Sequence, residues 1–356
     1  MGMKRASFKV FQSLAVAGVL SALGGLSTAQ TAFAADATLV AAAEKEGQLV
    51  VYGDPFTVPL LLKAFGAKYP KIKVTSATGD AWQIYNRFVA ENAAGKPLLD
   101  VMYQAEDTVI TAKTSGYLAD FASDEAGSLS ELGLPPGGGY VRGNGNLILF
   151  AYNHDSMANK QVPKDWTDYI SPPAEWDGLG AMSNPGSSSA TFATVAAIYQ
   201  TFGPEKGGAI LKGFRSAKGE LNPSMGVMAT KLQTGERPLD FFNITTAISG
   251  IIAKGAPVTM AVPVSGGVAQ FNAIGLSKNA PHPNAARLLA DFALGHEMQT
   301  IFAEAGVYPV RNGVTPPKGL PVLAEVKLLS LDLEKALKDR DTILNWWAAS
   351  TGFSYR

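Results

Sequence analysis

Short apolar runs alternate with helical patterns along the first third of the chain, and this alternation constrains the fold more than any other feature. The runs at residues 49–52, 72–75 and 100–103 have the length and composition of buried strands. Between them, apolar residues recur every three or four positions, as in the helix expected from Asp80 onward. Strands and helices that alternate in this way form mostly parallel sheets covered on both faces. The pattern therefore predicts an α/β protein.

The second half of the chain continues the pattern after a Pro- and Gly-rich interruption at residues 135–139. A strand is expected at residues 147–152, and a second unit begins at Gly180. Further helices are expected at residues 190–201, 206–216, 226–234, 284–294 and 296–304, with a strand at 257–263. The length exceeds what one hydrophobic core usually serves, so we expect two lobes.

Residues 1–34 have the three-part layout of a secretory signal peptide. Three basic residues precede an apolar run from Phe11 to Leu26, and small residues lead to an A-x-A site that ends at Ala34. Several Gly and Ser residues break the apolar run, which disfavours an uncleaved membrane anchor. The chain has no Cys, which excludes lipid attachment. We therefore expect cleavage after Ala34 and a periplasmic location.

Charge and Cys content exclude several classes of function. Without residues 1–34, which carry three basic and no acidic residues, 27 basic and 30 acidic residues remain. Nucleic acids and anionic membranes require a concentrated basic surface, which this balance does not favour. The absence of Cys leaves no disulfide, no thiolate nucleophile and no sulfur-ligated metal site.

Several segments resemble extracellular solute-binding proteins of ABC importers. They occur in the order EKEGQLVVYGDP, FGAKYPKIKV, RFVAENAAGKPLLDVMY, ILFAYNHD, WDGLGAMSNPGSSS and AGVYPVRNG, between Glu44 and Asn312. The similarity is to the branch that includes ferric-iron, thiamine and phosphonate binders. It implies a two-lobe α/β clamp of the type II class, in which two crossing strands join the lobes and the ligand lies in the cleft. The lobes would be residues 35–149 plus 262–356 and residues 150–261, with crossovers near 150–152 and 258–262.

The loops that follow the predicted strands are candidates for the ligand site. Ligands of open α/β sheets bind at the carboxyl ends of the strands, and the loops at residues 52–57, 78–80 and 104–106 have this position. The loop at 183–189 leads directly into a helix, whose free N–H groups suit a carboxylate, phosphate or phosphonate, although Asn-Pro-Gly-Ser also forms ordinary turns and caps. The ligand-binding residues predicted from these loops are Tyr52, Asp54, Phe56, Thr57, Thr78, Gly79, Gln104, Asn184, Gly186, Ser187, Ser188 and Ser189.

The segment at residues 241–247 argues against iron. In the iron-binding members that the chain resembles, two adjacent Tyr stand at this place, whereas this chain has Thr245 and Thr246, whose hydroxyls cannot replace phenolates. The three His residues are far apart and fit no metal-ligand spacing. We therefore predict no metal, with ferric-iron binding as the alternative. Asn243, Thr245 and Thr246 better suit an oxygen-rich organic ligand.

Two arginines could pair with an anionic ligand. Arg142, in the loop before the first crossover, is included among the predicted ligand-binding residues. Arg87 lies on a helix flank, where a surface ion pair is the favoured interpretation.

The sequence gives no support for an enzyme. G-x-S-x-G, H-E-x-x-H, Walker A and G-x-G-x-x-G are absent in the required form. Carboxylate pairs of the glycosidase kind depend on the fold rather than on spacing, so a secreted hydrolase is the alternative from another class. The sequence predicts a monomeric periplasmic component of an ABC importer, without cofactor or nucleic-acid partner. It would capture a hydroxylated carboxylate, or a phosphonate or phosphate ester, for the inner-membrane permease.

Overall fold

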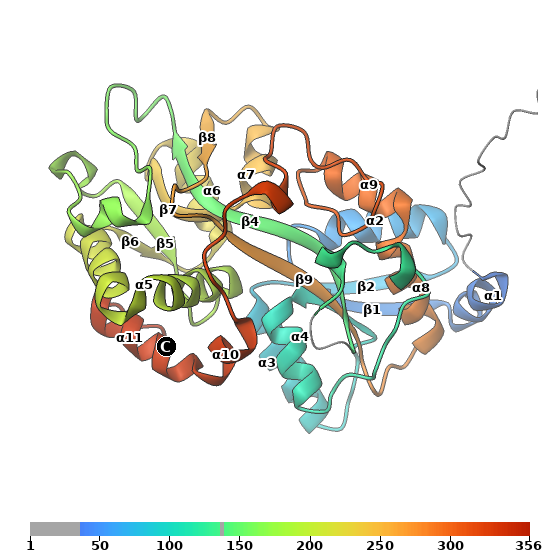
Figure 1. The fold of residues 1–356 in the computed structure, drawn as a ribbon. Coiled ribbons are helices and arrows are strands. Elements are labelled where there is room, and N and C mark those ends of the chain that lie inside the picture. Colours follow the sequence, from blue (N-terminus) through green and yellow to red (C-terminus); the bar gives the residue numbers. More distant parts are fainter. Residues whose placement is uncertain (1–35, 136–138) are drawn as a thin grey trace, which may run out of the picture. The chain divides into compact units, whose positions relative to one another are not determined.

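The computed structural model describes residues 36–135 and 139–356, so the predicted signal peptide lies outside the described residues. The strands form a nine-stranded sheet in the order β2-β1-β3-β9-β4-β7-β5-β6, with β8 paired to β4 (Figure 1). Their bounds are β1 Gln48–Gly53, β2 Lys73–Thr78, β3 Val101–Ala105, β4 Val141–Asn153, β5 Gly180–Ser183, β6 Glu220–Asn222, β7 Leu239–Ile244, β8 Val258–Ala261 and β9 Val268–Leu276.

Two parallel groups of strands are joined by two antiparallel ones. β1 is parallel to β2 and β3, and β5 is parallel to β6 and β7. The long strands β4 and β9 pair with each other in antiparallel fashion, with Asn146 opposite Gln270, and they connect the two groups. β4 begins before the predicted strand at residues 147–152, and β9 was not predicted. Both β9 and β8, the strand within the predicted crossover at residues 258–262, run antiparallel along β4, and β9 pairs with it over the longer stretch (Figure 1).

Helices cover both faces of the sheet, as the alternation predicts. Their bounds are α1 Ala37–Glu46, α2 Val58–Lys68, α3 Ala81–Ala93, α4 Glu106–Thr114, α5 Ser189–Ser216, α6 Met225–Thr234, α7 Thr245–Ile252, α8 Pro283–Leu294, α9 His296–Glu304, α10 Leu333–Lys338 and α11 Arg340–Thr351. α5 is interrupted at Gly203, which has a non-helical φ of 74° and precedes Pro204. It therefore consists of two helices, as the sequence predicts. Within the described ranges, no helix has the length and apolarity that a membrane crossing requires.

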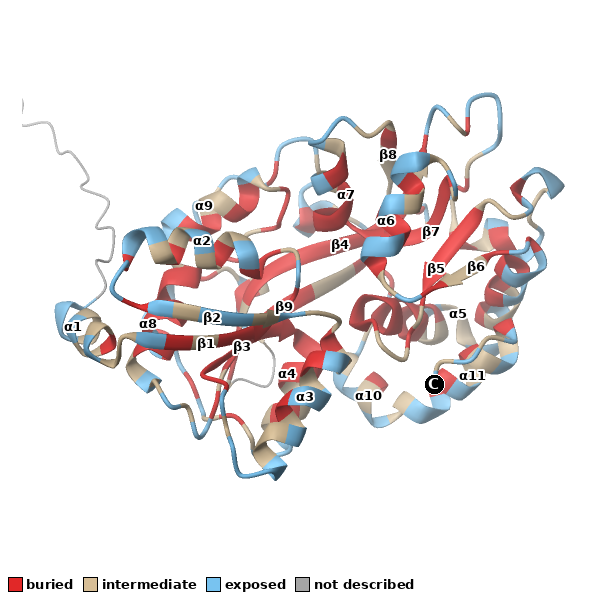
Figure 2. Cartoon of the chain, turned by 180° about the vertical axis from the view of Figure 1, so that it is seen from behind, coloured by how far each residue is buried: buried red, intermediate tan, exposed pale blue. Residues whose placement is uncertain are grey.

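The buried side chains of the described residues form four clusters, which we group in pairs into a first and a second core. The first core lies on both faces of β1 and β3, where Val51 and Tyr103 face one side and Tyr52 and Met102 the other. The second core packs β4, β5 and β7 against α5, α6 and α7 around the buried ring of Trp166. Figure 2 shows the central strands buried, while the edge strand β2 is largely exposed. β4 and β9 contribute side chains to both cores.

The C-terminal helices pack with the second core. Trp347 on α11 is fully buried there, and α11 lies along α5. The sequence prediction instead counts residues 262–356 with the first lobe. The limits of the lobes remain a prediction, and this packing favours counting the C-terminal helices with the second lobe.

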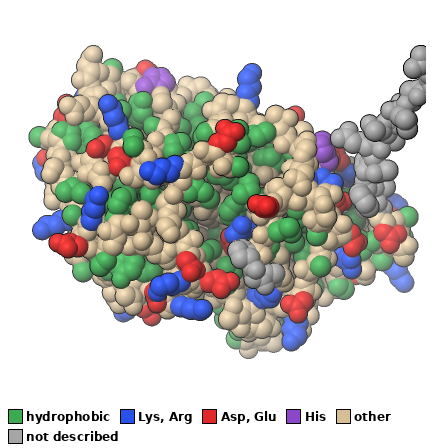
Figure 3. Space-filling model, in the orientation of Figure 1, with side chains coloured by type: hydrophobic (Ala, Val, Ile, Leu, Met, Phe, Trp, Pro, Cys, Tyr) green, Lys and Arg blue, Asp and Glu red, His purple; other side chains and the backbone are tan. Residues whose placement is uncertain are grey.

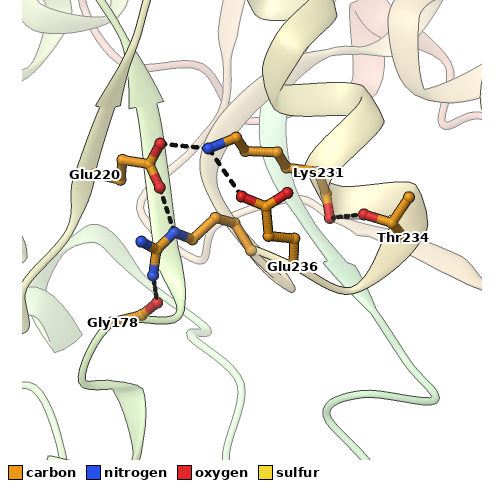
Figure 4. A network of polar contacts seen from close by, with 6 residues as sticks. Gly178, Glu220, Lys231, Thr234 and Glu236 are labelled. Atoms are coloured by element: carbon orange, nitrogen blue, oxygen red, sulfur yellow. Dashed lines mark hydrogen bonds and ion pairs between the residues drawn. The ribbon is translucent and has the colours of Figure 1, made fainter.

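An ion-pair network fixes α6 to the neighbouring strand. Lys231 on α6 binds Glu220 on β6 and also lies 3.0 Å from Glu236 (Figure 4). Arg237 pairs with the same Glu220 and donates to the carbonyl of Gly178. The network lies at the far end of α6 from Ser224, so it holds the helix while its first residues are left to line a cavity.

Candidate functional site

A cavity of about 220 Å³ lies between elements of the two cores. We call it the main cavity. Its lining is polar at most positions, and five helices start at its wall. The lining residues are Asp54, Pro55, Phe56, Gly79, Asp80, Ala81, Gln104, Ala105, Asn146, Ser188, Ser189, Ala190, Ser224, Met225, Gly226, Ile244, Thr246, Gln270 and Asn272.

Helix N-termini dominate the electrostatics of the main cavity. The first or capping residues of α3, α4, α5, α6 and α7 all belong to its wall. Ser188 and Ser224 cap their helices by accepting the N–H groups of Thr191 and Val227, whereas α3, α4 and α7 have no side-chain cap. Each start carries a partial positive charge and N–H groups without intrahelical partners. The wall is therefore suited to an anion, although its described lining residues include no Lys, Arg or His.

Asp54 holds a loop of the cavity wall in place. Its Oδ1 accepts the N–H groups of Phe56 and Thr57 at 2.8 and 2.9 Å, and its Oδ2 accepts the Thr57 hydroxyl and, at 3.0 Å, the amide of Asn272. Burial raises the pKa of Asp54, and the bonds from Thr57 and Phe56 act against this rise. The carboxylate is thus committed to the loop and to β9, which makes it a structural part of the site.

Asp80 is the second acidic residue of the wall, and unlike Asp54 its carboxylate is free to bind a solute. It has the N-cap position of α3 but makes no capping hydrogen bond. Burial raises its pKa. A carboxylate placed this way can accept hydrogen bonds from hydroxyl groups of a bound molecule.

Amide side chains from the two long strands form the floor of the main cavity. Asn146 on β4 stands opposite Gln270 on β9, and Asn272 follows on the same face of β9. The hydroxyl and the N–H of Thr246 both donate to Asn146 Oδ1. Sequence reasoning missed Gln270 and Asn272 because β9 was not predicted, and it missed Asn146 because the predicted strand began at residue 147. The available signal was the alternation of Gln270 and Asn272 with apolar residues, which is typical of a strand with one polar face.

Seven of the predicted ligand-binding residues come together in this wall. They are contributed by loops of both cores and by the starts of α5 and α7, and they are Asp54, Phe56, Gly79, Gln104, Ser188, Ser189 and Thr246. Phe56 also packs against the second core although its loop belongs to the first. Beyond them, the structure adds Asp80, Asn146, Ser224, Gln270 and Asn272 to the polar lining.

Four predicted residues of the first lobe lie elsewhere. Tyr52 is buried, its hydroxyl bonds Glu91 at 2.9 Å, and burial followed by this bond raises its pKa to about 12. Thr57 is buried behind Asp54. Thr78 ends β2 and is exposed.

Arg142, the fourth, donates from Nε to Glu106 at 2.7 Å and stacks on Phe271, with 4.1 Å to the ring centre. It lines a neighbouring cavity of about 170 Å³ that shares Ser189 and Gln270 with the main cavity. Its charge is thereby neutralised. Arg87, on the helix flank, pairs with Glu91 at 2.8 Å.

Five predicted residues of the second lobe support the wall from behind. Asn184 caps the turn before α5 by accepting the N–H of Gly186 at 2.7 Å, and Ser187 continues this turn. A Cβ at Gly186 would lie 2.1 Å from the carbonyl oxygen of Tyr355, so glycine is required for packing. Asn243 bonds Asp240 at 2.6 Å, and the Thr245 hydroxyl accepts the N–H of Leu147.

Comparison with known proteins places these features in a wider group. A model of the family "bacterial extracellular solute-binding protein" matches residues 61–326. An uncharacterized protein of Haemophilus influenzae is 24% identical over 343 residues, which cover 90% of this chain and 96% of that protein. The periplasmic binding protein AfuA of Actinobacillus pleuropneumoniae, with fructose-6-phosphate bound, has a TM-score of 0.78, 21% identity and coverage of 86% and 99%. Iron-bound HitA of Pseudomonas aeruginosa has a TM-score of 0.72, 21% identity and coverage of 85% and 99%.

Proposed function

Because the chain belongs to the family of bacterial extracellular solute-binding proteins, we propose that it captures a small organic anion and delivers it to an ABC permease. Proteins of this family bind solutes and are not enzymes. The fold is the predicted α/β clamp of type II periplasmic binding proteins. We also propose that residues 1–34 are a cleaved signal peptide that directs the chain to the periplasm.

The convergence of five helix starts on the main cavity carries the proposal of an anion. Helix N-termini bind carboxylates and phosphates through backbone N–H groups, without a buried countercharge. Arg142, which lines the neighbouring cavity, is engaged by Glu106. An anion would thus be held by backbone N–H groups, including that of Ser189, and by the hydroxyls of Ser188 and Ser224.

The rest of the lining favours a hydroxylated body on this anion. Asp80, Asn146, Gln270 and Asn272 provide carboxylate and amide groups that can pair with hydroxyls. A hydroxylated carboxylate and a phosphate ester both have this combination, with a phosphonate as a related candidate. The sugar phosphate bound to AfuA supports the phosphate ester. On the face shown in Figure 3, described basic and acidic side chains are interspersed, which does not favour nucleic acid as a partner.

A ligand screen tests this function, and we expect organic acids or phosphate esters to bind. Tight binding raises the free energy of unfolding by roughly 3–4 kcal/mol at 100 to 1,000 times Kd, which thermal unfolding detects readily. A screen in which only neutral sugars, amines or metals bind would contradict the proposal. Ferric citrate is one arm of the screen, because HitA is iron-bound. The main cavity has no Tyr or His among its described lining residues, so we expect no purple-red charge-transfer band with iron.

Closure of the cleft should accompany solute binding. We propose that the first lobe comprises residues 35–149 and 262 to about 328, and that the second comprises 150–261 together with about 329–356, which pack on α5. The lobes would rotate about β4 and β9, since hinges form where few residues absorb the change. Solution scattering should report a monomer whose radius of gyration falls when the anion found in the screen is added. An unchanged radius at saturating ligand would refute the hinge.

A further inference from the structure

Four buried polar atoms occur where helices of the first core meet helices of the second. They belong to Trp82 on α3, Asp107 on α4, Ser189 on α5 and Arg340 on α11. Within the part of the chain that the structure describes, Trp82 Nε1, Asp107 Oδ2, Ser189 Oγ and Arg340 Nη1 have no hydrogen-bond partner and almost no contact with solvent. Buried polar groups are normally paired. Four unpaired ones in the same contact therefore require an explanation.

Arg340 inserts between the two sides of this contact. Its guanidinium carbon lies 4.0 Å from the ring centre of Trp82 and 4.5 Å from that of Phe192 on α5. Its Nη2 donates to the carbonyl of Gly186 at 3.1 Å. The flat guanidinium thus stacks on an aromatic ring of each core, which is the arrangement that arginine favours over lysine.

Asp107 faces all three donors. Its side chain is 3% exposed. Burial raises its pKa to about 6, and the Ser189 hydroxyl, the Arg340 charge and the Trp82 N–H act against this rise. Oδ1 accepts the N–H of Thr108 at 2.9 Å, which leaves Oδ2 toward the donors.

Because these four buried groups lack hydrogen-bond partners, a relative movement of the two cores in either direction would be favourable. If the two cores move apart, the four groups regain water. If they move slightly closer, the hydroxyl, the indole N–H and the guanidinium can reach Oδ2, and buried charge-assisted hydrogen bonds are strong. Either movement would satisfy the four unpaired groups, one by opening the contact and the other by closing it.

We propose that Asp107, Ser189, Arg340 and Trp82 form a latch that holds the cleft closed over the solute. Asp107 is the acceptor from the first core, and Ser189 and Arg340 are the donors from the second. The inference rests on the proposed function, because Ser189 also lines the main cavity. A solute seated at the start of α5 fixes Ser189 and therefore the latch. Asp107 acts in this way as a positioning residue for the solute site.

The latch requires an ionised Asp107, so acidification should release it. Arg340 provides the opposing charge, and the pKa of Arg340 is lowered by its burial while Asp107 acts against that change. The pKa of Arg340 is also influenced by Asp341 on α11 and by Tyr355. The other charged groups on the surrounding helices are Arg87 and Glu91 on α3, Glu106 and Lys113 on α4, Glu205, Lys206, Lys212 and Arg215 on α5, and Glu334, Lys335 and Lys338 on α10. Glu106 and Arg142 pair with each other, as do Arg87 and Glu91.

A distance measurement between the two cores tests the latch without any solute. The chain has no Cys, so Asn86→Cys on α3 and Thr342→Cys on α11, both exposed, can carry spin labels without competition. At pH 7.5 we expect a population at a distance slightly shorter than in this structure, because the latch forms when the two cores move closer. Asp107→Asn should lose that population in favour of longer distances, and acidifying the parent to pH 5 should give the same shift. In the Asp107→Asn protein, acidification should have no further effect.

Matched variants separate a latch from general damage. Asp341→Asn makes the same chemical change next to Arg340 but on an exposed side chain, and it should leave the distances unchanged. Arg340→Gln gives a second removal of the latch if Asp107→Asn folds poorly. The proposal would be overturned if the distances stayed the same in Asp107→Asn, in Arg340→Gln and at low pH. It would also be overturned if Asp341→Asn changed the distances as much as Asp107→Asn does. A shift in distance combined with a screen that finds no anion would retain the latch and reject the proposed solute.

Discussion

Replacing Asp240 with Asn should stabilise the protein at pH 7 by up to about 4 kcal/mol. Asp240 is fully buried on β7, where Oδ2 accepts the amide of Asn243 at 2.6 Å and Oδ1 has no partner among the described residues. Burial raises its pKa to about 8, against about 3.9 in an unfolded chain. The nearby hydroxyl of Tyr169 has a raised pKa as well, through burial and then through Asp240. The site therefore favours an uncharged side chain.

The sign of this effect follows from proton linkage. Between about pH 3.9 and pH 8 the folded protein holds a proton that the unfolded chain releases, so stability is highest at low pH and falls as the pH rises. Within this range, each rise of one pH unit lowers the free energy of unfolding by about 1.4 kcal/mol. Asn stays neutral throughout and keeps an oxygen for Asn243, so the two proteins should differ little at pH 4.

Urea unfolding followed by circular dichroism at pH 4 to pH 8 measures this difference. The control is Asp120→Asn, because the Asp120 side chain is 92% exposed and should tolerate the change at every pH. Equal pH dependence in the parent and in the Asp240→Asn protein would show that Asp240 ionises without penalty. A gain of stability in the control of the same size would show that the effect is not local.

Much of the fold could be predicted because its signals are local. The strands β1, β2 and β3 are short apolar runs with helical patterns between them, and the break of α5 at Gly203 is visible as a Gly-Pro pair. β9 escaped prediction because Gln270 and Asn272 interrupt its apolar pattern. These polar residues face the main cavity, so the strand departs from the core pattern where it forms the site.

The packing of the C-terminus could not be predicted in the same way. α11 carries Ile343, Leu344 and Trp347 at helical spacing, which is a sufficient signal for a helix. Which core that helix joins depends on contacts with α5, about 140 residues earlier in the chain. No local pattern encodes such a contact, and the predicted lobe limits therefore rested on the family resemblance, which assigns residues 262–356 to the first lobe.

In the candidate site, too, local features could be predicted from the sequence and long-range contacts could not. Loops after strands are recognisable, and seven of the sixteen predicted residues line the main cavity. Arg142 had the right charge and a plausible position, yet it is neutralised by Glu106, which lies 36 residues earlier in the chain. The amides of β4 and β9 line the site because these two strands pair there. This pairing is long-range, and the spacing of residues along the sequence does not reveal it.

Replacing Ser188 with Asp should reduce affinity for the anion by about 100-fold or more. Ser188 lines the main cavity and caps α5, its hydroxyl accepting the N–H of Thr191 at 3.3 Å. Asp is an equally good N-cap and its charge suits a helix start, so the fold should be preserved. The same carboxylate would occupy the positive end that the solute requires, and like charges placed together cost several kcal/mol. Calorimetry with the anion found in the screen measures the loss.

Ser188→Asn separates charge from shape in this test. Asn has nearly the size of Asp and caps helices equally well, but it is neutral. If the start of α5 binds the anion, Ser188→Asn should retain most of the affinity while Ser188→Asp loses it. Equal losses in both variants would mean that the pocket tolerates no larger side chain at residue 188, whatever its charge. Full affinity in the Ser188→Asp protein would mean that the anion does not bind at the start of α5, and the remaining helix starts, α3, α4, α6 and α7, would have to hold it.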